Sequence, residues 1–86
     1  FATAVDDAEI IAAVDEVAKT EGCLLCPEGA ATYAAYKKEL SQGRVRPDES
    51  VVLFNCASGI KYPLPPADRS IDISQPIDYK AIAHAQ

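Results

Sequence analysis

The first part of the chain alternates apolar and polar residues with the period of a helix. Its apolar residues fall three or four positions apart on one helix face: Ile10, Val14, Val17 and Ala18. Asp6 stands just before this pattern and Glu9 follows three residues later, which is the spacing of a capping box. Gly22 follows the last periodic residue as a left-handed C-cap. The pattern predicts a helix over about residues 7–21.

A short apolar run comes next and leads into a second helical pattern. Residues 23–26, Cys-Leu-Leu-Cys, stand between Gly22 and Pro27, which favours a brief buried strand. The sequence EGAATYAAYKKELSQ then consists largely of good helix formers. It predicts a helix over about residues 28–42, with Gly43 as its C-cap.

The third pattern is a continuous apolar run. Residues 51–54, Val-Val-Leu-Phe, are rich in β-branched side chains, which is typical of a parallel strand covered on both faces. A turn of small residues, 55–59, follows this run. The stretch KYPLPPADRSIDISQP contains four of the six prolines and predicts an extended surface tail. One last short helix is expected over residues 78–85.

The order helix, strand, helix, strand and tail predicts an α/β fold. Two parallel strands joined by a helix form a right-handed crossover, which is one unit of a three-layer parallel-sheet architecture. Parallel sheets need further strands and cover on both faces, so two strands do not make a domain. We therefore expect a fragment of a larger domain, with residues 1–63 as its α/β portion and residues 64–86 as a tail.

Charge and hydropathy argue against two classes of partner. The 86 residues carry a formal net charge of −5 with dispersed Lys and Arg, whereas a nucleic-acid surface needs clustered basic side chains. The apolar runs are far too short to span a membrane. Three cysteines, an odd number without a dense framework, predict reduced thiols in a cytoplasmic protein.

Cys23 and Cys26 form a C-x-x-C pair with three interpretations. A redox pair would normally lie at a helix N-terminus. A zinc site needs two more ligands, and the remaining candidates, Cys56 and His84, match no familiar spacing. Free cysteines are among the most buried residue types, which favours two small apolar side chains on a short strand.

Candidate chemistry lies where the two predicted strands end, because ligands of open α/β sheets bind there. Asn55, Cys56 and Ser58 offer an amide, a thiol and a hydroxyl, which orient a heterocycle and do not suit acid–base chemistry. Glu28 begins the second helix, where it complements the helix dipole or lines a cofactor. An ordinary tight loop also explains the small residues of the turn. We predict no catalytic residue and no metal site in this chain.

Two stretches resemble a known family. TEGCLLCPEGAATYAAYKKEL and DESVVLFNCASGIKYP, in this order and at this spacing, are similar to the C-terminal part of the threonine-synthase-like pyridoxal-phosphate enzymes. These enzymes have the tryptophan-synthase-like fold, also called fold type II. The resemblance covers about residues 5–63 and makes residues 1–63 a C-terminal portion of a pyridoxal-phosphate-binding catalytic domain.

The resemblance implies a lyase that converts O-phosphohomoserine and water to threonine and phosphate. It places Cys56 where the family has a Ser or Thr hydroxyl against the pyridine nitrogen of the cofactor. A thiol is a weaker hydrogen-bond partner than a hydroxyl, so either Cys56 or Ser58 takes this role. Asn55 belongs to the same turn, and Glu28 matches an acidic position near the cofactor ring.

The same resemblance implies that the chain is incomplete as an enzyme. The Schiff-base lysine and the glycine-rich phosphate loop of this family lie upstream, and Lys61 belongs to the second motif. The chain alone is therefore expected to be inactive, and its partner is expected to be the remainder of the enzyme. The alternative is a stand-alone, non-catalytic α/β module that associates with a partner or with itself.

Overall fold

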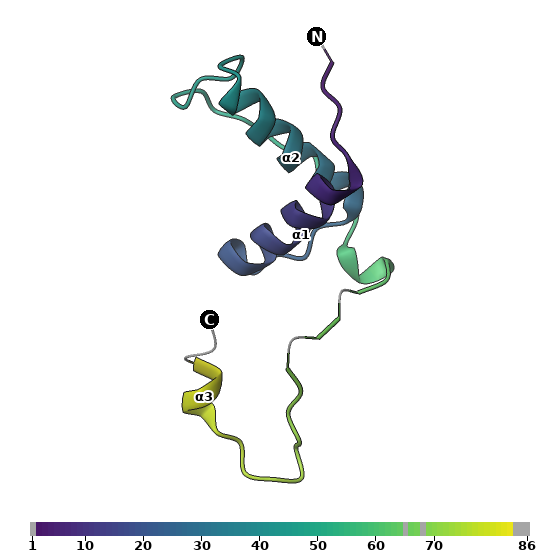
Figure 1. The fold of residues 1–86 in the computed structure, drawn as a ribbon, viewed down its shortest axis with the longest axis vertical. Helices are drawn as coiled ribbons and strands as arrows, with labels where there is room; N and C mark the ends of the chain where they lie inside the picture. The colour runs from purple at the N-terminus through teal and green to yellow at the C-terminus, as the bar shows by residue number, and fades with distance from the viewer. Residues whose placement is uncertain (1, 65, 68, 84–86) are drawn as a thin grey trace.

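The computed structural model describes residues 2–64, 66–67 and 69–83. Helices α1 and α2 pack against each other, and the tail leads away from this pair to α3 (Figure 1). The chain is elongated, with principal extents of 55 × 27 × 20 Å. Its helical elements follow one another along the chain: α1 (Asp7–Glu21), α2 (Pro27–Ser41), the 3-10 turn η1 (Gly59–Lys61) and α3 (Tyr79–Ala83).

Helix α1 begins and ends where its sequence predicts. The Asp6 side chain accepts a hydrogen bond from the Glu9 N–H at 2.8 Å, and the Glu9 side chain accepts one from the Asp6 N–H at 2.8 Å. This reciprocal pair is the expected capping box. Gly22 adopts φ 65° and donates its N–H to the Ala18 carbonyl at 3.1 Å. The predicted helix and both of its caps are confirmed.

Helix α2 confirms the second helical prediction with small shifts at both ends. It starts at Pro27, whose fixed φ suits the first helical position, and Cys26 acts as the N-cap. Its C-cap is Gln42, and not Gly43 as predicted. Gly43 follows in the left-handed conformation, with φ 78°.

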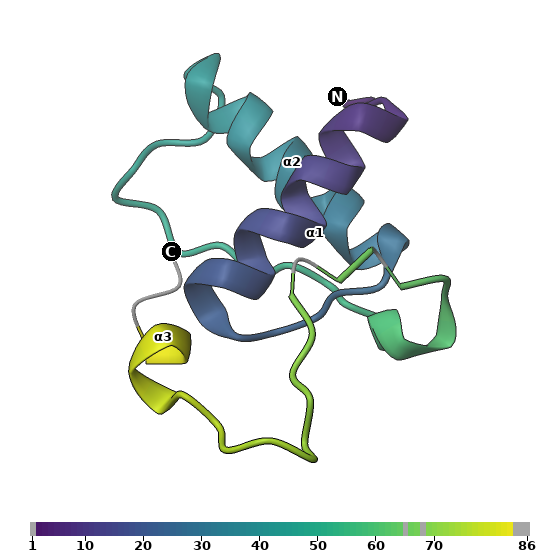
Figure 2. The ribbon, with the colours of Figure 1, turned by 60° about the horizontal axis from the view of Figure 1, so that its bottom comes forward.

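The contact between α1 and α2 uses small side chains. Buried residues at and near the contact are Ala13 and Val17 of α1 together with Ala30 of α2. Figure 2 shows α1 lying across α2, and short side chains let two helices approach closely. The resulting core is small, because alanine buries little apolar surface per residue.

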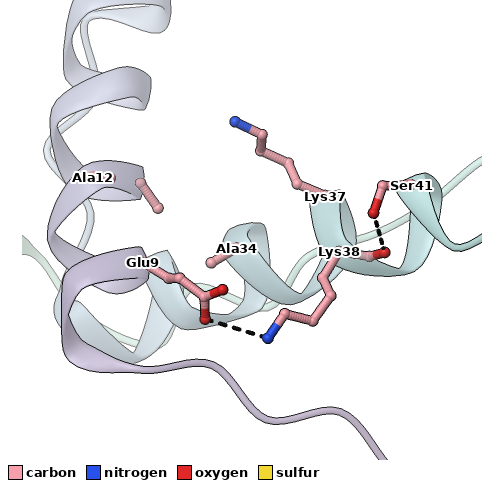
Figure 3. Close-up of a pocket in the computed structure, with 7 residues that line it drawn as sticks. Glu9, Ala12, Ala34, Lys37, Lys38 and Ser41 are labelled. Atoms are coloured by element: carbon pink, nitrogen blue, oxygen red, sulfur yellow. Dashed lines mark hydrogen bonds and ion pairs between the residues drawn. The ribbon is translucent and has the colours of Figure 1, made fainter.

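A shallow cleft of about 400 Å³ opens beside this contact. Figure 3 shows Ala12 and Ala34 pointing into the space between the helices, with Glu9 and Lys38 joined across it. The Lys38 ammonium lies 3.3 Å from Glu9, and the Lys37 ammonium lies 3.0 Å from Glu16 on the same side of the pair. Such partly exposed ion pairs contribute about 0–1 kcal/mol each, so they orient the helices more than they stabilise them.

The other face of α1 borders a larger groove of about 810 Å³, called here the α1 groove. Ile10, Val14 and Ala18, which belong to the predicted apolar face of the helix, line it and are only half-buried. The opposite wall comes from the segments before α2 and after η1: Leu24, Leu25, Tyr62 and Leu64. The apolar stripe of α1 is therefore correctly placed by its periodicity but is incompletely covered by this chain.

The predicted parallel α/β unit is wrong. The described residues form no sheet, and their one β-bridge, between Leu25 and Ser58, is antiparallel. Residues 51–54 make no backbone hydrogen bond with another described segment, and Val52 and Phe54 remain 94% and 78% exposed. A strand exists only through hydrogen bonds to a neighbour, and the described part of the chain supplies none for this run. The three-layer arrangement is consequently absent among the described residues.

The tail follows η1 and leads to α3. Asp78 accepts a hydrogen bond from the Ala81 N–H at 3.1 Å, as an N-cap does, and Arg69 donates to the Ala81 carbonyl at 3.5 Å. A helix was expected over residues 78–85, and α3 lies inside this range. Residues 84 and 85 of the expected helix fall outside the described residues.

Glu39 is a buried carboxylate that ties three segments together. It is only 5% exposed and accepts hydrogen bonds from the Arg44 guanidinium, one of them at 2.7 Å, and from the Thr3 hydroxyl. These partners, Arg44 first, lower the pKa of the Glu39 carboxyl from 4.5 to about 2. The chain before α1 and the loop after α2 are thereby fixed to the last turns of α2.

We expect Glu39→Gln to destabilise the chain at neutral pH and to remove part of its acid sensitivity. Because folding lowers the pKa of Glu39, its ion pair stabilises the folded chain fully above about pH 4.5 and is lost as the pH falls to about 2. The difference in unfolding free energy between the wild type and the variant should therefore be largest at pH 7 and vanish near pH 2. Urea unfolding followed by circular dichroism across this range measures it.

Asp15→Asn is the matched control, because it removes an exposed carboxylate that pairs with Lys19 at 2.9 Å on the surface of α1. Exposed pairs of this kind contribute little, so its unfolding should follow the wild type at every pH. Equal stability of Glu39→Gln and the wild type at pH 7 would contradict a stabilising role for the buried carboxylate.

Candidate functional site

The turn of residues 55–59 lies against the segment that precedes α2. Leu25 and Ser58 form the antiparallel bridge, and the Gly59 N–H donates to the Leu24 carbonyl at 3.1 Å. Two stretches more than 30 positions apart in the sequence are thereby joined at the N-terminus of α2. The residues predicted for the site come from these two stretches.

Gly59 makes this close approach possible. A Cβ at this position would lie 2.6 Å from the Leu24 Cγ atom and 2.6 Å from the Leu25 carbonyl oxygen. Both separations are far below ordinary van der Waals contact, and the carbonyl belongs to the backbone. The bridge therefore requires a glycine here for reasons of space.

Cys26 and Asn55 connect the turn to the first turn of α2. Cys26 is fully buried; its sulfur accepts the Gly29 N–H at 3.3 Å, and its thiol donates to the Asn55 Oδ1 atom at 3.1 Å. Gly29 has no Cβ, and one placed there would lie 2.0 Å from the same oxygen. The Asn55 amide is thus held directly over the start of α2.

Cys56 lies next to this contact and is exposed. Interaction with the Cys26 side chain, followed by partial burial, raises the pKa of the Cys56 thiol above its ordinary value of 9.0. Glu28 raises it further through its negative charge. Cys56 is therefore a protonated thiol near neutral pH, able to donate a hydrogen bond.

Glu28 is paired with a residue that the sequence did not single out. The Tyr62 hydroxyl donates to both carboxylate oxygens of Glu28, at 3.0 and 3.2 Å. Hydrogen bonds from its own backbone N–H and from Tyr62 hold the pKa of Glu28 below 4.5, while the carboxylate raises the pKa of Tyr62 above 10.0. Glu28 is therefore ionised at neutral pH.

The structure brings three of the four predicted residues together and places the fourth beside them. At the N-terminus of α2, Asn55 bonds to Cys26 and Glu28 bonds to Tyr62, and Cys56 follows Asn55 in the turn. Ser58 sits in the bridge with Leu25, and its hydroxyl oxygen accepts the Ile60 N–H at 3.3 Å as the cap of η1.

Sequence reasoning missed Cys26 and Tyr62 as parts of this site. Cys26 precedes a proline at the start of a helix, so its N-cap position was readable from the pattern. Nothing in the spacing joins Tyr62 to Glu28, which lies 34 positions away. The two cysteines of the C-x-x-C pair differ in exposure, because Cys26 is buried whereas Cys23 is exposed.

The arrangement suits recognition of a nitrogen heterocycle. An exposed thiol, an amide and an ionised carboxylate stand together on backbone held by the bridge. These groups can donate to or accept from a ring nitrogen and its polar substituents.

Among the described residues no group of three or more His, Cys, Asp or Glu side chains is placed to hold a metal, and His84 lies outside them. Nor do they include a helix long and apolar enough to cross a membrane.

Comparisons with known proteins match most of the chain. The family model described as "Pyridoxal-phosphate dependent enzyme" matches residues 1–57, a range that contains Glu28, Asn55 and Cys56. The threonine synthase of Methanocaldococcus jannaschii is 36% identical over 63 residues. This alignment covers 73% of the chain and 16% of that protein, so the chain spans a small part of the relative's length. No solved structure gives a significant match.

Proposed function

The chain belongs to the family of pyridoxal-phosphate dependent enzymes, and on this premise we propose that it is a C-terminal segment of a threonine-synthase-type lyase. The gathering of Glu28, Asn55 and Cys56 at the N-terminus of α2 carries the proposal. The whole enzyme would convert O-phosphohomoserine and water to threonine and phosphate in amino-acid biosynthesis. The likeness to a threonine synthase supports this choice among the reactions of the family.

In this proposal the segment orients the cofactor ring and carries no catalytic residue. Bound pyridoxal phosphate supplies an electron-withdrawing ring that stabilises negative charge on an amino-acid substrate. The protonated Cys56 thiol would hydrogen-bond the ring nitrogen, with the Ser58 hydroxyl as the other candidate. Asn55 and the ionised Glu28 would fix polar substituents and exclude water on the same side.

The partner in this proposal is the remainder of the enzyme. The chain aligns with only 16% of its relative, and it leaves the run 51–54 and the apolar α1 groove uncovered. Both surfaces are apolar and would be buried by further elements of a larger domain. Association with a second copy of the chain is the alternative outcome when the remainder is missing. The three free cysteines support a cytoplasmic location.

We expect Cys56→Ser to tighten pyridoxal-phosphate binding in the polypeptide that contains this segment together with the remainder of the enzyme. A hydroxyl is a stronger hydrogen-bond partner than a thiol, and one neutral hydrogen bond contributes about 0.5–1.5 kcal/mol. The dissociation constant should therefore fall by roughly two- to twelvefold, as measured by equilibrium binding of the cofactor.

Cys23→Ser is the control for this variant, because it makes the same change at an exposed thiol outside the cluster and should leave the affinity unchanged. If Cys56→Ser and Cys56→Ala both bind the cofactor as the wild type does, Cys56 does not meet the ring. Ser58→Ala then tests the other candidate.

Phosphate release from O-phosphohomoserine by the same polypeptide tests the reaction itself, and its absence alongside normal cofactor binding would point to another amino-acid substrate.

A further inference from the structure

The buried Cys26 and the exposed Cys56 lie on the two stretches that meet at the junction between α2 and the turn. Cys26 has no part in the proposed contact with the cofactor, although its side chain is fully buried. We propose that Cys26 and Cys56 are a reversible oxidation site, at which a peroxide joins them in a disulfide.

Backbone and side-chain contacts hold the two cysteines in place. The bridge between Leu25 and Ser58 fixes the residues that flank them, one on each stretch. The Cys26 thiol donates to Asn55, the neighbour of Cys56, at 3.1 Å. Cys56 therefore comes one residue after a direct contact of the Cys26 sulfur, and an interaction with the Cys26 side chain raises the pKa of Cys56. We expect a disulfide between the two to leave the bridge in place.

Cys23 is the competing partner for Cys26, and the local backbone disfavours it. Leu25, between the two cysteines, lies in a β-bridge, which requires an extended backbone. Three residues of extended chain span about 10 Å between Cα atoms. A disulfide needs a Cα separation below about 7 Å, so the folded segment keeps Cys23 too far away.

The oxidation requires one peroxide molecule for each disulfide. Cys56, the exposed member, loses its proton, and its thiolate attacks hydrogen peroxide, breaks the O–O bond and becomes a sulfenic acid; the released hydroxide takes up the proton to give one water. The sulfur of Cys26 then attacks the sulfenic sulfur, forms the S–S bond and releases a second water. Two thiols lose two electrons and two protons, and the peroxide is reduced to water. A dithiol reductant reverses the change.

The consequence for the cofactor rests on the proposed function. A disulfide removes the S–H group with which Cys56 would meet the ring nitrogen, and it draws the sulfur toward Cys26. Oxidised enzyme should then bind pyridoxal phosphate more weakly than reduced enzyme. The disulfide itself needs no cofactor, so its formation can be tested separately.

The test treats the chain with hydrogen peroxide, blocks the remaining thiols with N-ethylmaleimide and identifies the products by intact mass and peptide mapping. The wild type should lose two hydrogen atoms, take up one maleimide on Cys23 and show a peptide linked through Cys26 and Cys56. Cys23→Ser, the matched control, should form the same link, whereas Cys26→Ser and Cys56→Ser should form none within the chain. Dithiothreitol should restore three reactive thiols in the wild type.

Urea provides the reference for an unfolded chain. In the unfolded chain, loop closure favours the Cys23–Cys26 link, three positions apart, over the Cys26–Cys56 link, 30 positions apart, by about 30-fold. The Cys23–Cys26 link should therefore dominate in urea, and the Cys26–Cys56 link should dominate in buffer. A Cys23–Cys26 link in buffer, or oxidation of Cys56 to a sulfinic acid without any link, would overturn the proposal. A disulfide that leaves the cofactor affinity of the whole enzyme unchanged would overturn only its coupling to the proposed function.

Discussion

Replacing Gly59 with alanine is expected to detach the turn of residues 55–59 from the N-terminus of α2. The new methyl group would lie 2.6 Å from a backbone carbonyl, at Leu25, and 2.6 Å from the Leu24 side chain. A carbonyl fixed in a bridge cannot move aside as the end of a long side chain can. Overpacking of this kind costs about 1–3 kcal/mol, which is comparable to what a single bridge and its side-chain bonds contribute.

Amide hydrogen exchange at residue 59 measures this detachment, because the N–H there bonds to the Leu24 carbonyl. A cost of about 1–3 kcal/mol corresponds to exchange that is roughly 5- to 150-fold faster. Ile60→Ala, at a neighbouring side chain that is 76% exposed, is the control and should leave exchange at residue 59 unchanged. Equal protection of the amide in Gly59→Ala and the wild type would show that the turn does not depend on this contact.

The double substitution Val52→Lys and Phe54→Lys is expected to abolish association through the run 51–54. Both side chains are almost fully exposed in the chain alone, and burying a Val or Phe side chain contributes about 1.5–3 kcal/mol. Losing both contributions weakens an interface by about 3 kcal/mol or more, which is at least a 100-fold rise in the dissociation constant. The effect should appear in self-association of the chain and in its binding to the remainder of the enzyme.

Sedimentation equilibrium of the chain, alone and mixed with the remaining part of the enzyme, provides the measurement. Ile71→Lys with Ile73→Lys is the matched control, because it places two lysines at the same spacing on apolar residues that are 54% and 88% exposed. Association that survives the first pair of substitutions and is lost with the second would assign the interface to the tail.

The helices of this protein are readable from its sequence because their signals are local. Asp6 with Glu9, and the closing Gly22, lie within one or two turns of the residues they affect. The run 51–54 has an equally clear apolar composition, yet it forms no strand among the described residues. Whether such a run becomes a strand depends on a neighbour that lies elsewhere in the sequence, and composition cannot supply one.

The sequence likewise indicates only those parts of the candidate site that have a local signal. Asn55, Cys56 and Ser58 were predicted from a turn of small polar residues after an apolar run and Glu28 from its place at the start of a helix, and the family resemblance favoured all four. The partners that organise them, Cys26 and Tyr62, act across 29 and 34 positions. Contacts of that range leave no periodic pattern, so they become visible only when the two stretches are placed side by side.

The position of these contacts along the chain also bears on the order in which the molecule is assembled. Helices α1 and α2 end at Ser41, so both leave the ribosome before the turn of residues 55–59 does. Chains are synthesised from the N-terminus, and we expect the helix pair to form before the turn reaches it. The turn that bears Asn55 and Cys56 is therefore added to a helix pair that already exists. During synthesis, the capped N-terminus of α2 acts as the template on which the last part of the site is built.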